Sequence, residues 1–288
     1  MPMNPRILRP LARPLLLDAV PGAAAAYSLR QLSNAYTGPV VTVRRSSDDA
    51  EEDFKASEID DGTLAAFCGA GDGFVKTWFD QSGNTGRDAS QGTAASQPKI
   101  VDSGSVVLEE GKPAIQFDGS NDYLSNALTV WGRNGVLPFW IFSVANANTE
   151  ASGVGTIAAA RIAAPPFDGW QLRCNSGTTG AVFCVDYNGS VGDGVTSLQD
   201  VRDKQSLLSV TLDGTPAAWI NGAYDVSSAG DDISSAYSPS VTTMNIGATG
   251  TTASASDHLK GTLQEFLLYF ADQSANRERI EGDLAWYY

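Results

Sequence analysis

The sequence is poor in the residues that most often build metal sites and nucleophilic active sites. Its 288 residues include one histidine, His258, and three cysteines, Cys68, Cys174 and Cys184. The cysteine count is odd and no two cysteines have C-x-x-C spacing, so buried free thiols are expected and a zinc site is not. A Ser-His-Asp triad would have His258 as its single available base, in a Ser/Thr/Ala-rich loop.

Positive charge and long apolar runs are also scarce. There are 19 Lys and Arg residues against 33 Asp and Glu, a net charge of −14, which disfavours a nucleic-acid surface. No apolar run reaches about 18 residues, so no membrane-spanning helix is predicted. The basic, proline-containing segment 1–21 has an apolar run interrupted by Asp18, too short for a signal peptide. We expect residues 1–21 to form an extended arm that contacts other protein subunits.

Glycine is abundant, with 29 residues, and charged residues make up only 18% of the chain. Short stretches such as "GFVKTWFD", "PAIQFDG", "FWIFSVA" and "SLLSVTLDG" have β-type patterns bounded by Gly, Asp or Pro. The sequence therefore predicts an all-β fold, a jelly-roll sandwich of two antiparallel sheets with a few short peripheral helices. We expect residues 22–288 to form this single domain, with no internal repeat.

Apolar spacing predicts three short helices, within residues 23–36, 61–71 and 274–288. Asp213-Gly214 and Asn221-Gly222 are typical hairpin turns. The acidic run from Asp48 to Asp53 lacks the ligand spacing and central glycine of an EF-hand. We interpret it as a solvated loop whose acids are offset by Arg44 and Arg45.

Two groups of segments resemble known families. "AYSLRQLSNAYTGPVVTVRRSSDDAEEDF" and "TWFDQSGNTGRDASQ" resemble the N-terminal part of the α-L-arabinofuranosidase B catalytic module, most specifically from Phe79 to Arg87. "QFDGSNDYLS", "TLDGTPAAWINGAYD" and the segment 263–288 resemble concanavalin A-like, laminin-G-like jelly rolls. The combination is similar to many bacteriophage virion proteins. This resemblance implies a virion location after assembly in bacterial cytoplasm, and a homo-oligomer, with a trimer as one candidate.

The arabinofuranosidase resemblance also indicates where catalytic carboxylates would lie. The family's nucleophile glutamate aligns with Asn188 in "VDYNG", and its acid aligns with Thr249 in "IGAT". Neither an amide nor a threonine hydroxyl can do the work of a carboxyl group. By this alignment both catalytic acids are replaced, and no catalytic residue is assigned. A shift of a few residues would instead pair Asp186 with Asp193 or with Asp257.

Binding residues follow from aromatic and polar groups near "VDYNG". The candidate carbohydrate-binding patch is Trp170, Asp186, Tyr187 and Asn188. The alternative is that Trp170 and Tyr187 are ordinary core or edge residues. No cofactor is expected. Asp118, Asn121 and Asp122 form a weak calcium motif in a segment that is chiefly a structural turn.

Three functions are consistent with these observations. The first is a non-catalytic phage virion protein, on head or tail, whose jelly roll contacts host glycans and whose residues 1–21 contact other virion proteins. The second is a glycoside hydrolase of arabinofuranosidase type. The third is a purely structural capsid or tail decoration protein. The missing carboxylates favour the first, while an opposed pair of acids in a cleft would favour the second.

Overall fold

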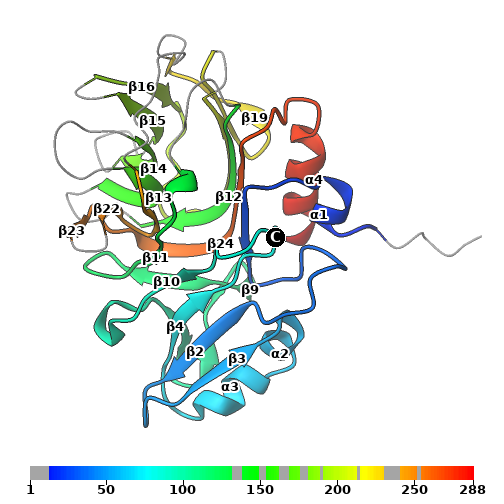
Figure 1. Ribbon diagram of the computed structural model, residues 1–288, viewed down its shortest axis with the longest axis vertical. Coiled ribbons are helices and arrows are strands. Elements are labelled where there is room, and N and C mark those ends of the chain that lie inside the picture. Colours follow the sequence, from blue (N-terminus) through cyan, green and yellow to red (C-terminus); the bar gives the residue numbers. More distant parts are fainter. Residues whose placement is uncertain are drawn as a thin grey trace, which may run out of the picture.

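The computed structural model describes residues 13–131, 138–148, 154–161, 169–175, 181–188, 191–212, 215–229, 241–251 and 254–288. Two antiparallel β-layers pack against each other, and the helices lie at the periphery (Figure 1). This confirms the predicted all-β, jelly-roll-like sandwich with few short helices. No helix among the described residues is long and apolar enough to cross a membrane.

The first layer combines strands from the whole length of the chain. β1 (Ala25–Ser28) pairs with β24 (Lys260–Tyr269), next to the stretch of β24 that pairs with β10. The other strands follow one another across the layer in this order: β3 (Glu51–Phe54), β2 (Val41–Arg45), β4 (Gly73–Trp78), β6 (Lys99–Asp102), β10 (Ile115–Asp118), β24, β12 (Trp140–Ala147), β17 (Ser206–Thr211), β18 (Ala217–Ile220) and β19 (Ala223–Tyr224).

The second layer is built mainly from the middle of the chain. Its first strand, β5, pairs with β4 of the first layer as well as with β11, and this pairing joins the two layers at one side. In order, the strands are β5 (Ala89–Ser90), β11 (Leu124–Asn126), β21 (Met244–Ile246), β13 (Val154–Arg161), β14 (Gly169–Asn175), β15 (Val182–Asn188), β16 (Val191–Thr196) and β20 (Ser228–Ala229).

Three short pairings complete the sheet structure. β7 (Ser105–Val106) extends β6, while β8 (Leu108–Glu109) with β9 (Lys112–Pro113) and β22 (Thr249–Thr251) with β23 (Ser254–Ser256) form separate hairpins.

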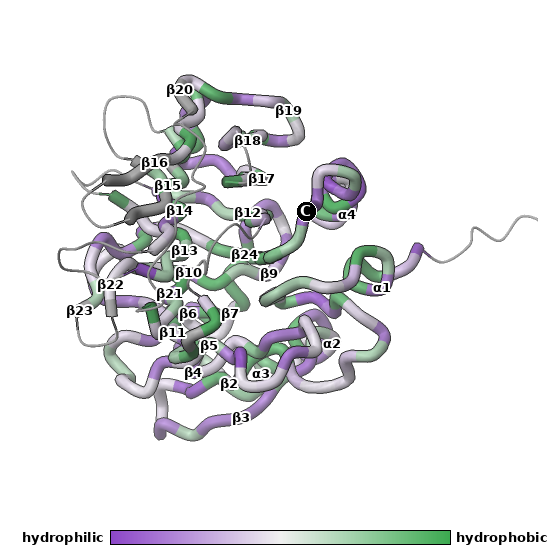
Figure 2. The backbone as a smooth tube through the Cα atoms, turned by 45° about the horizontal axis from the view of Figure 1, so that its top comes forward, coloured by the Kyte–Doolittle hydropathy of each residue, from purple (hydrophilic) through white to green (hydrophobic). Residues whose placement is uncertain are grey.

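The main core lies between the two layers. Trp170 of β14 stacks on Phe266 of β24, with ring centroids 6.5 Å apart and an interplanar angle of 10°. The ring centroids of Phe139 and Trp170 are 5.2 Å apart. Apolar residues run through β12, β24 and β10, while the segment around β3 is largely hydrophilic (Figure 2). Burial of these apolar side chains is the main stabilising contribution to the sandwich.

A second core lies on the outer face of the first layer, beneath α1 (Leu16–Ala19) and α4 (Arg277–Tyr287). Leu16 and Leu17 of α1 and Ile280 and Leu284 of α4 are buried against β12 and β24. The predicted C-terminal helix is therefore confirmed. The arm was expected to be extended through residue 21, but residues 16–19 form a helical turn because their leucines pack on the body. Residues 1–12 lie outside the described residues.

The remaining helices are short. They are α2 (Ala56–Asp60), α3 (Thr63–Cys68) and the 3-10 turns Ala94–Ser96 and Thr129–Trp131. α3 confirms the helix predicted within 61–71, and it ends at Gly69, whose φ of 61° suits glycine.

The helix predicted within 23–36 is wrong, because residues 25–28 form strand β1 instead. All four residues of β1 are buried and pair with β24, so tertiary pairing overrides the helix propensity of the alanine run. Asn221 and Gly222 form the predicted turn with φ of 52° and 80°. The other predicted turn, Asp213-Gly214, lies outside the described residues. All three cysteines are buried and free, as expected.

Candidate functional site

The residues singled out in "VDYNG" lie near the end of β15, between β14 and β16. The strand register places Asp186 directly opposite Trp170 on one side and Asp193 on the other. Residues opposite one another in an antiparallel ladder share one face of the sheet. Since Trp170 belongs to the main core, positions 186 and 193 lie on the face that looks toward the first layer. The side chains of residues 186–188 and 193 lie outside the described part of the structure.

Trp170 itself is a core residue. Its side chain is fully buried and its indole N–H donates to the carbonyl of Trp131 at 3.0 Å. It therefore has no free ring face for a sugar, and the ordinary-core interpretation left open by the sequence describes it. The sugar-binding role proposed for Asp186, Tyr187 and Asn188 stays a prediction.

Asp186 and Asp193 are unusual as cross-strand partners. Among the described strand pairs, no other acidic residue stands directly opposite a second acidic residue. In general, like charges directly opposite one another in an antiparallel ladder are destabilising. Opposite Cβ atoms in such a ladder are about 4.5–5.5 Å apart, which suits two carboxyl groups acting on one glycosidic bond.

The two positions aligned with the family's carboxylates do not face each other. Thr249 lies two residues after Gly247, whose N–H donates to the carbonyl of Ile157 in the middle of β13. Asn188 lies beyond the level of Arg161, the last residue of β13, because Tyr187 pairs with Gly169 and Gly169 with Arg161. Four residues of strand separate the two levels by about 13 Å. Acid pairs in glycosidases are at most about 9.5 Å apart, so Asn188 and Thr249 do not replace an acting pair.

Asp257 is also a poor partner for Asp186. Its carbonyl accepts a hydrogen bond from Thr156, and Thr156 pairs with Arg173, which pairs with Phe183. Asp257 therefore lies level with residue 183, two strands away from β15 and about 10 Å further along it. Of the two pairings that the sequence left open, the register favours Asp186 with Asp193.

The "DQSG" run, the most specific part of the resemblance, clamps the N-terminal segment. Asp80 is buried and accepts hydrogen bonds from the N–H groups of Ala26 at 2.7 Å and Ser82 at 3.1 Å. Gln81 accepts from the N–H of Leu32 and donates to two backbone carbonyls of the same segment. Burial raises the pKa of Asp80, although these hydrogen bonds oppose the shift. The run therefore holds β1 and the following turn in place.

The acidic run and the "QFDGSNDYL" segment are also structural. Arg44 pairs with Asp49 at 2.6 Å and Arg45 with Asp48 at 2.7 Å, as the solvated-loop interpretation predicted. Asp118 accepts hydrogen bonds from three successive backbone N–H groups, which closes a turn. Among the described residues, no group of three or more His, Cys, Asp or Glu side chains is arranged to hold a metal ion.

A buried polar cluster on the opposite face of the second layer was not found from the sequence. Gln171 donates to the hydroxyl of Thr156 at 2.8 Å, and Asn245 donates to the carbonyl of Gly250 at 2.9 Å. These side chains are fully buried, and Thr249 nearby is 3% exposed. Within the described residues, Asn245 Oδ1 and Thr249 Oγ1 have no hydrogen-bond partner. Isolated polar residues in β-patterned segments gave no signal that they would meet on one face.

Comparisons with known proteins agree with the arabinofuranosidase part of the resemblance. The family model described as "Alpha-L-arabinofuranosidase B, catalytic" matches residues 17–123. No curated protein matches the chain. Among solved structures, a GH54 α-L-arabinofuranosidase soaked with a cyclic sulfate inhibitor is 14% identical, with a TM-score of 0.65, and the match covers 93% of this chain.

Two further solved structures give the same result. An arabinofuranosidase complexed with arabinofuranosyl-α-1,2-xylobiose is 16% identical, and a GH54 α-L-arabinofuranosidase mutant soaked with 4-nitrophenyl α-L-arabinofuranoside is 14% identical. Both have a TM-score of 0.62 and cover 93% of this chain. The chain covers 64% of the length of each of these three structures. At such identities the likeness shows the fold. The protein contains an arabinofuranosidase-like β-sandwich module.

The expectation of a phage virion protein that serves in a tail fibre, in capsid decoration or in host attachment is wrong. The family model and the three structures described above are of arabinofuranosidases, and none of these findings indicates a virion role. That expectation rested on the resemblance to bacteriophage virion proteins, which the comparisons do not support, and on a basic N-terminal segment, unpaired cysteines and two apparently replaced carboxylates. Basic segments and unpaired cysteines occur in many kinds of protein, and the register shows that the two positions interpreted as replaced are not a facing pair.

Proposed function

We propose that the protein is a glycoside hydrolase of arabinofuranosidase type, acting on α-L-arabinofuranosyl groups. The observation that carries this proposal is the direct cross-strand register of Asp186 and Asp193 in a sandwich like that of arabinofuranosidases. The family-model match over residues 17–123 supports the same activity.

The chemistry requires two carboxyl groups in different protonation states. In a retaining mechanism one carboxylate attacks the anomeric carbon, while the other carboxylic acid protonates the leaving oxygen. Two carboxyl groups about 5 Å apart titrate as a coupled pair, because ionising one raises the pKa of the other. The facing positions 186 and 193 therefore offer a way to hold one proton between two acids near neutral pH.

Turnover of 4-nitrophenyl α-L-arabinofuranoside tests the proposal. We expect measurable release of 4-nitrophenol by the native chain, and a loss of kcat of roughly 10³-fold or more in both Asp186→Asn and Asp193→Asn. The pH–rate profile of the native chain should be bell-shaped, since one group must be ionised and the other protonated. Asp257→Asn serves as the matched control and should retain native turnover.

The proposal fails if the native chain releases no 4-nitrophenol, or if Asp186→Asn and Asp193→Asn retain full turnover. Loss of turnover in Asp257→Asn to the same extent as in Asp186→Asn would contradict the choice of Asp193 as the partner. Urea unfolding of each variant shows whether a loss of turnover reflects a loss of folding.

A further inference from the structure

A row of six residues crosses the first layer at right angles to its strands. Each member stands directly opposite the next in the strand register. From β12 to β2 the row is Asn146, Thr262, Gln116, Lys99, Phe74 and Arg44. Neighbouring strands are about 4.8 Å apart, so the row extends over about 24 Å, and cross-strand partners share one face.

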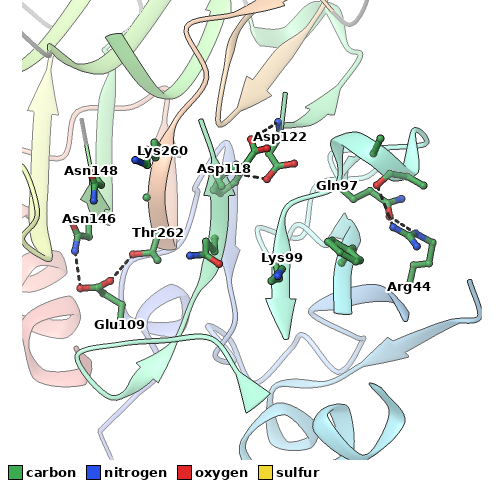
Figure 3. A pocket seen from close by; sticks show the side chains of 16 residues that line it. Arg44, Gln97, Lys99, Glu109, Asp118, Asp122, Asn146, Asn148, Lys260 and Thr262 are labelled. Carbon is green, nitrogen blue, oxygen red and sulfur yellow. Dashed lines mark hydrogen bonds between the residues drawn. The ribbon is translucent and has the colours of Figure 1, made fainter. Parts of the chain in front are cut away.

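All six residues line one cavity of about 830 Å³. The row forms its floor. Figure 3 shows Glu109 beside Asn146 and Thr262 at one end, Arg44 at the other, and Lys99 between them. The β8–β9 hairpin supplies Glu109, and the turn at residues 94–97 lines the cavity near Arg44. The cavity is elongated along the row, so its shape suits a chain molecule and not a single small ring.

The side chains at the two ends of the cavity, Glu109 and Arg44, are held in fixed positions. Glu109 accepts a hydrogen bond from Asn146 Nδ2 and another from Thr262 Oγ1, both at 2.9 Å. At the other end, Arg44 donates to Gln97 Oε1 at 2.7 Å and to the carbonyl of Ala94 at 3.2 Å. These contacts order the side chains before any ligand binds, which lowers the entropy cost of binding.

The floor between the walls keeps free hydrogen-bonding groups. Gln116, at the middle, is exposed, and its amide makes no hydrogen bond with the described residues. Asn146 Oδ1 likewise has no partner among them. Phe74 adds one aromatic ring, with the Arg44 guanidinium 4.9 Å and the Lys99 ammonium 6.0 Å from its centroid. Amides that both donate and accept, beside an aromatic ring, match hydroxyl groups on a sugar ring.

The cavity is lined by both cations and acids. Its cations are Arg44, Lys99 and Lys260, and its acids are Glu109, Asp118 and Asp122. Lys99 already pairs with Asp72 at 3.0 Å and with Asp102 at 2.9 Å, and Arg44 pairs with Asp49. An anionic ligand would therefore meet cations that are already paired with acids, and the acids of the cavity would repel it. Carboxylates accept hydrogen bonds from hydroxyl groups. A neutral ligand with many hydroxyl groups fits best.

We propose that this groove binds a neutral oligosaccharide chain of several rings, at a site separate from the Asp186–Asp193 pair. The two sites lie in different layers of the sandwich. The inference does not depend on whether the acid pair hydrolyses a substrate, since it rests on the lining of the groove alone.

Isothermal titration of the full chain with β-1,4-xylohexaose tests the inference. Xylohexaose contains no arabinofuranosyl group, so the proposed hydrolase activity would not consume it during the titration. We expect saturable binding with one site per chain, and an affinity for xylobiose roughly tenfold weaker or more, because the shorter chain fills less of the row. Gln116→Trp, which fills the middle of the groove from an exposed position, should weaken xylohexaose binding at least roughly tenfold.

Matched variants separate binding from folding. Tyr224→Trp also enlarges an exposed side chain but lies on β19, away from the groove, and should bind within about twofold of its parent. Gln116→Ala removes the amide without blocking the groove and should weaken binding a few-fold. Urea midpoints equal to that of the parent show that the variants fold.

The inference is overturned if xylohexaose gives no saturable heat, if Gln116→Trp binds as tightly as Tyr224→Trp, or if xylobiose binds as tightly as xylohexaose. Tighter binding of an oligogalacturonate of equal length would overturn the neutral-ligand assignment. Failure of 4-nitrophenyl arabinofuranoside turnover with intact xylohexaose binding would refute the proposed hydrolase and leave this inference standing.

Discussion

The buried ion network around Arg30 gives a prediction that can be worked out in detail. Arg30 donates to both carboxylate oxygens of Glu265, at 2.8 and 3.0 Å, and to Asp283 at 2.7 Å. Glu265 is fully buried and also accepts from Ser28 and from the hydroxyl of Tyr288. Burial lowers the pKa of Arg30, but the charge of Glu265, the hydrogen bonds to it and the nearby Tyr288 and Asp283 together outweigh burial and raise the pKa. The network ties the N-terminal segment and α4 to β24.

Arg30→Met keeps much of the aliphatic volume and removes the charge. Glu265 is then left buried without its cation, and removing one partner of a buried pair costs about 3–5 kcal/mol. The unfolding entropy is roughly 2.1 cal/mol/K per residue, or about 0.6 kcal/mol/K for this chain of 288 residues. The melting temperature should therefore fall by about 5–8 °C.

Urea unfolding at pH 7, followed by circular dichroism, measures this loss together with the thermal midpoint. In the double variant Arg30→Met/Glu265→Gln the orphaned charge is gone, so about 1–2 kcal/mol should return. Arg202→Met, at a surface pair whose side chains are 29% and 42% exposed, is the matched control and should cost less than about 1 kcal/mol. A loss in Arg30→Met no larger than in Arg202→Met would refute this reasoning.

Three other positions give predictions of their own. Burial, with repulsion from Asp118, raises the pKa of Asp122 to about 7. The stability that this group contributes is therefore lost as pH rises from about 4 through 7. In urea titrations at several pH values, Asp122→Asn should flatten that part of the curve of unfolding free energy against pH, by at most about 4 kcal/mol. An unchanged curve would contradict the shifted pKa. Gly282 lies within α4 with open space around its Cβ position, so Gly282→Ala should raise the free energy of unfolding by about 0.5–1 kcal/mol. Gly247 has φ of 87°, and a Cβ added there would overlap the ring of Phe117, so Gly247→Ala should lower the free energy of unfolding by about 2 kcal/mol or more. Equal effects of the two glycine variants would contradict the packing described.

The sequence correctly predicted those elements that are specified by residues close together in the chain. The α3 helix ends at Gly69, the turn at Asn221-Gly222 has two positive φ angles, and α4 follows its apolar spacing. The helix predicted in the alanine-rich stretch before Tyr36 was wrong. The propensity of this stretch favours a helix, but residues 25–28 pair with β24, more than 230 residues later in the chain. No pattern within the stretch carries that information.

The sequence alone determined the class of the fold, the state of the cysteines and the solvated nature of the acidic run, because period, turn residues and charge act over a few neighbouring positions. It also named Asp186 and Asp193 as candidates without choosing between Asp193 and Asp257. Only the tertiary structure decided that choice, the burial of Trp170 and the row from Asn146 to Arg44. These depend on strand register, which is set by packing between segments far apart in the chain.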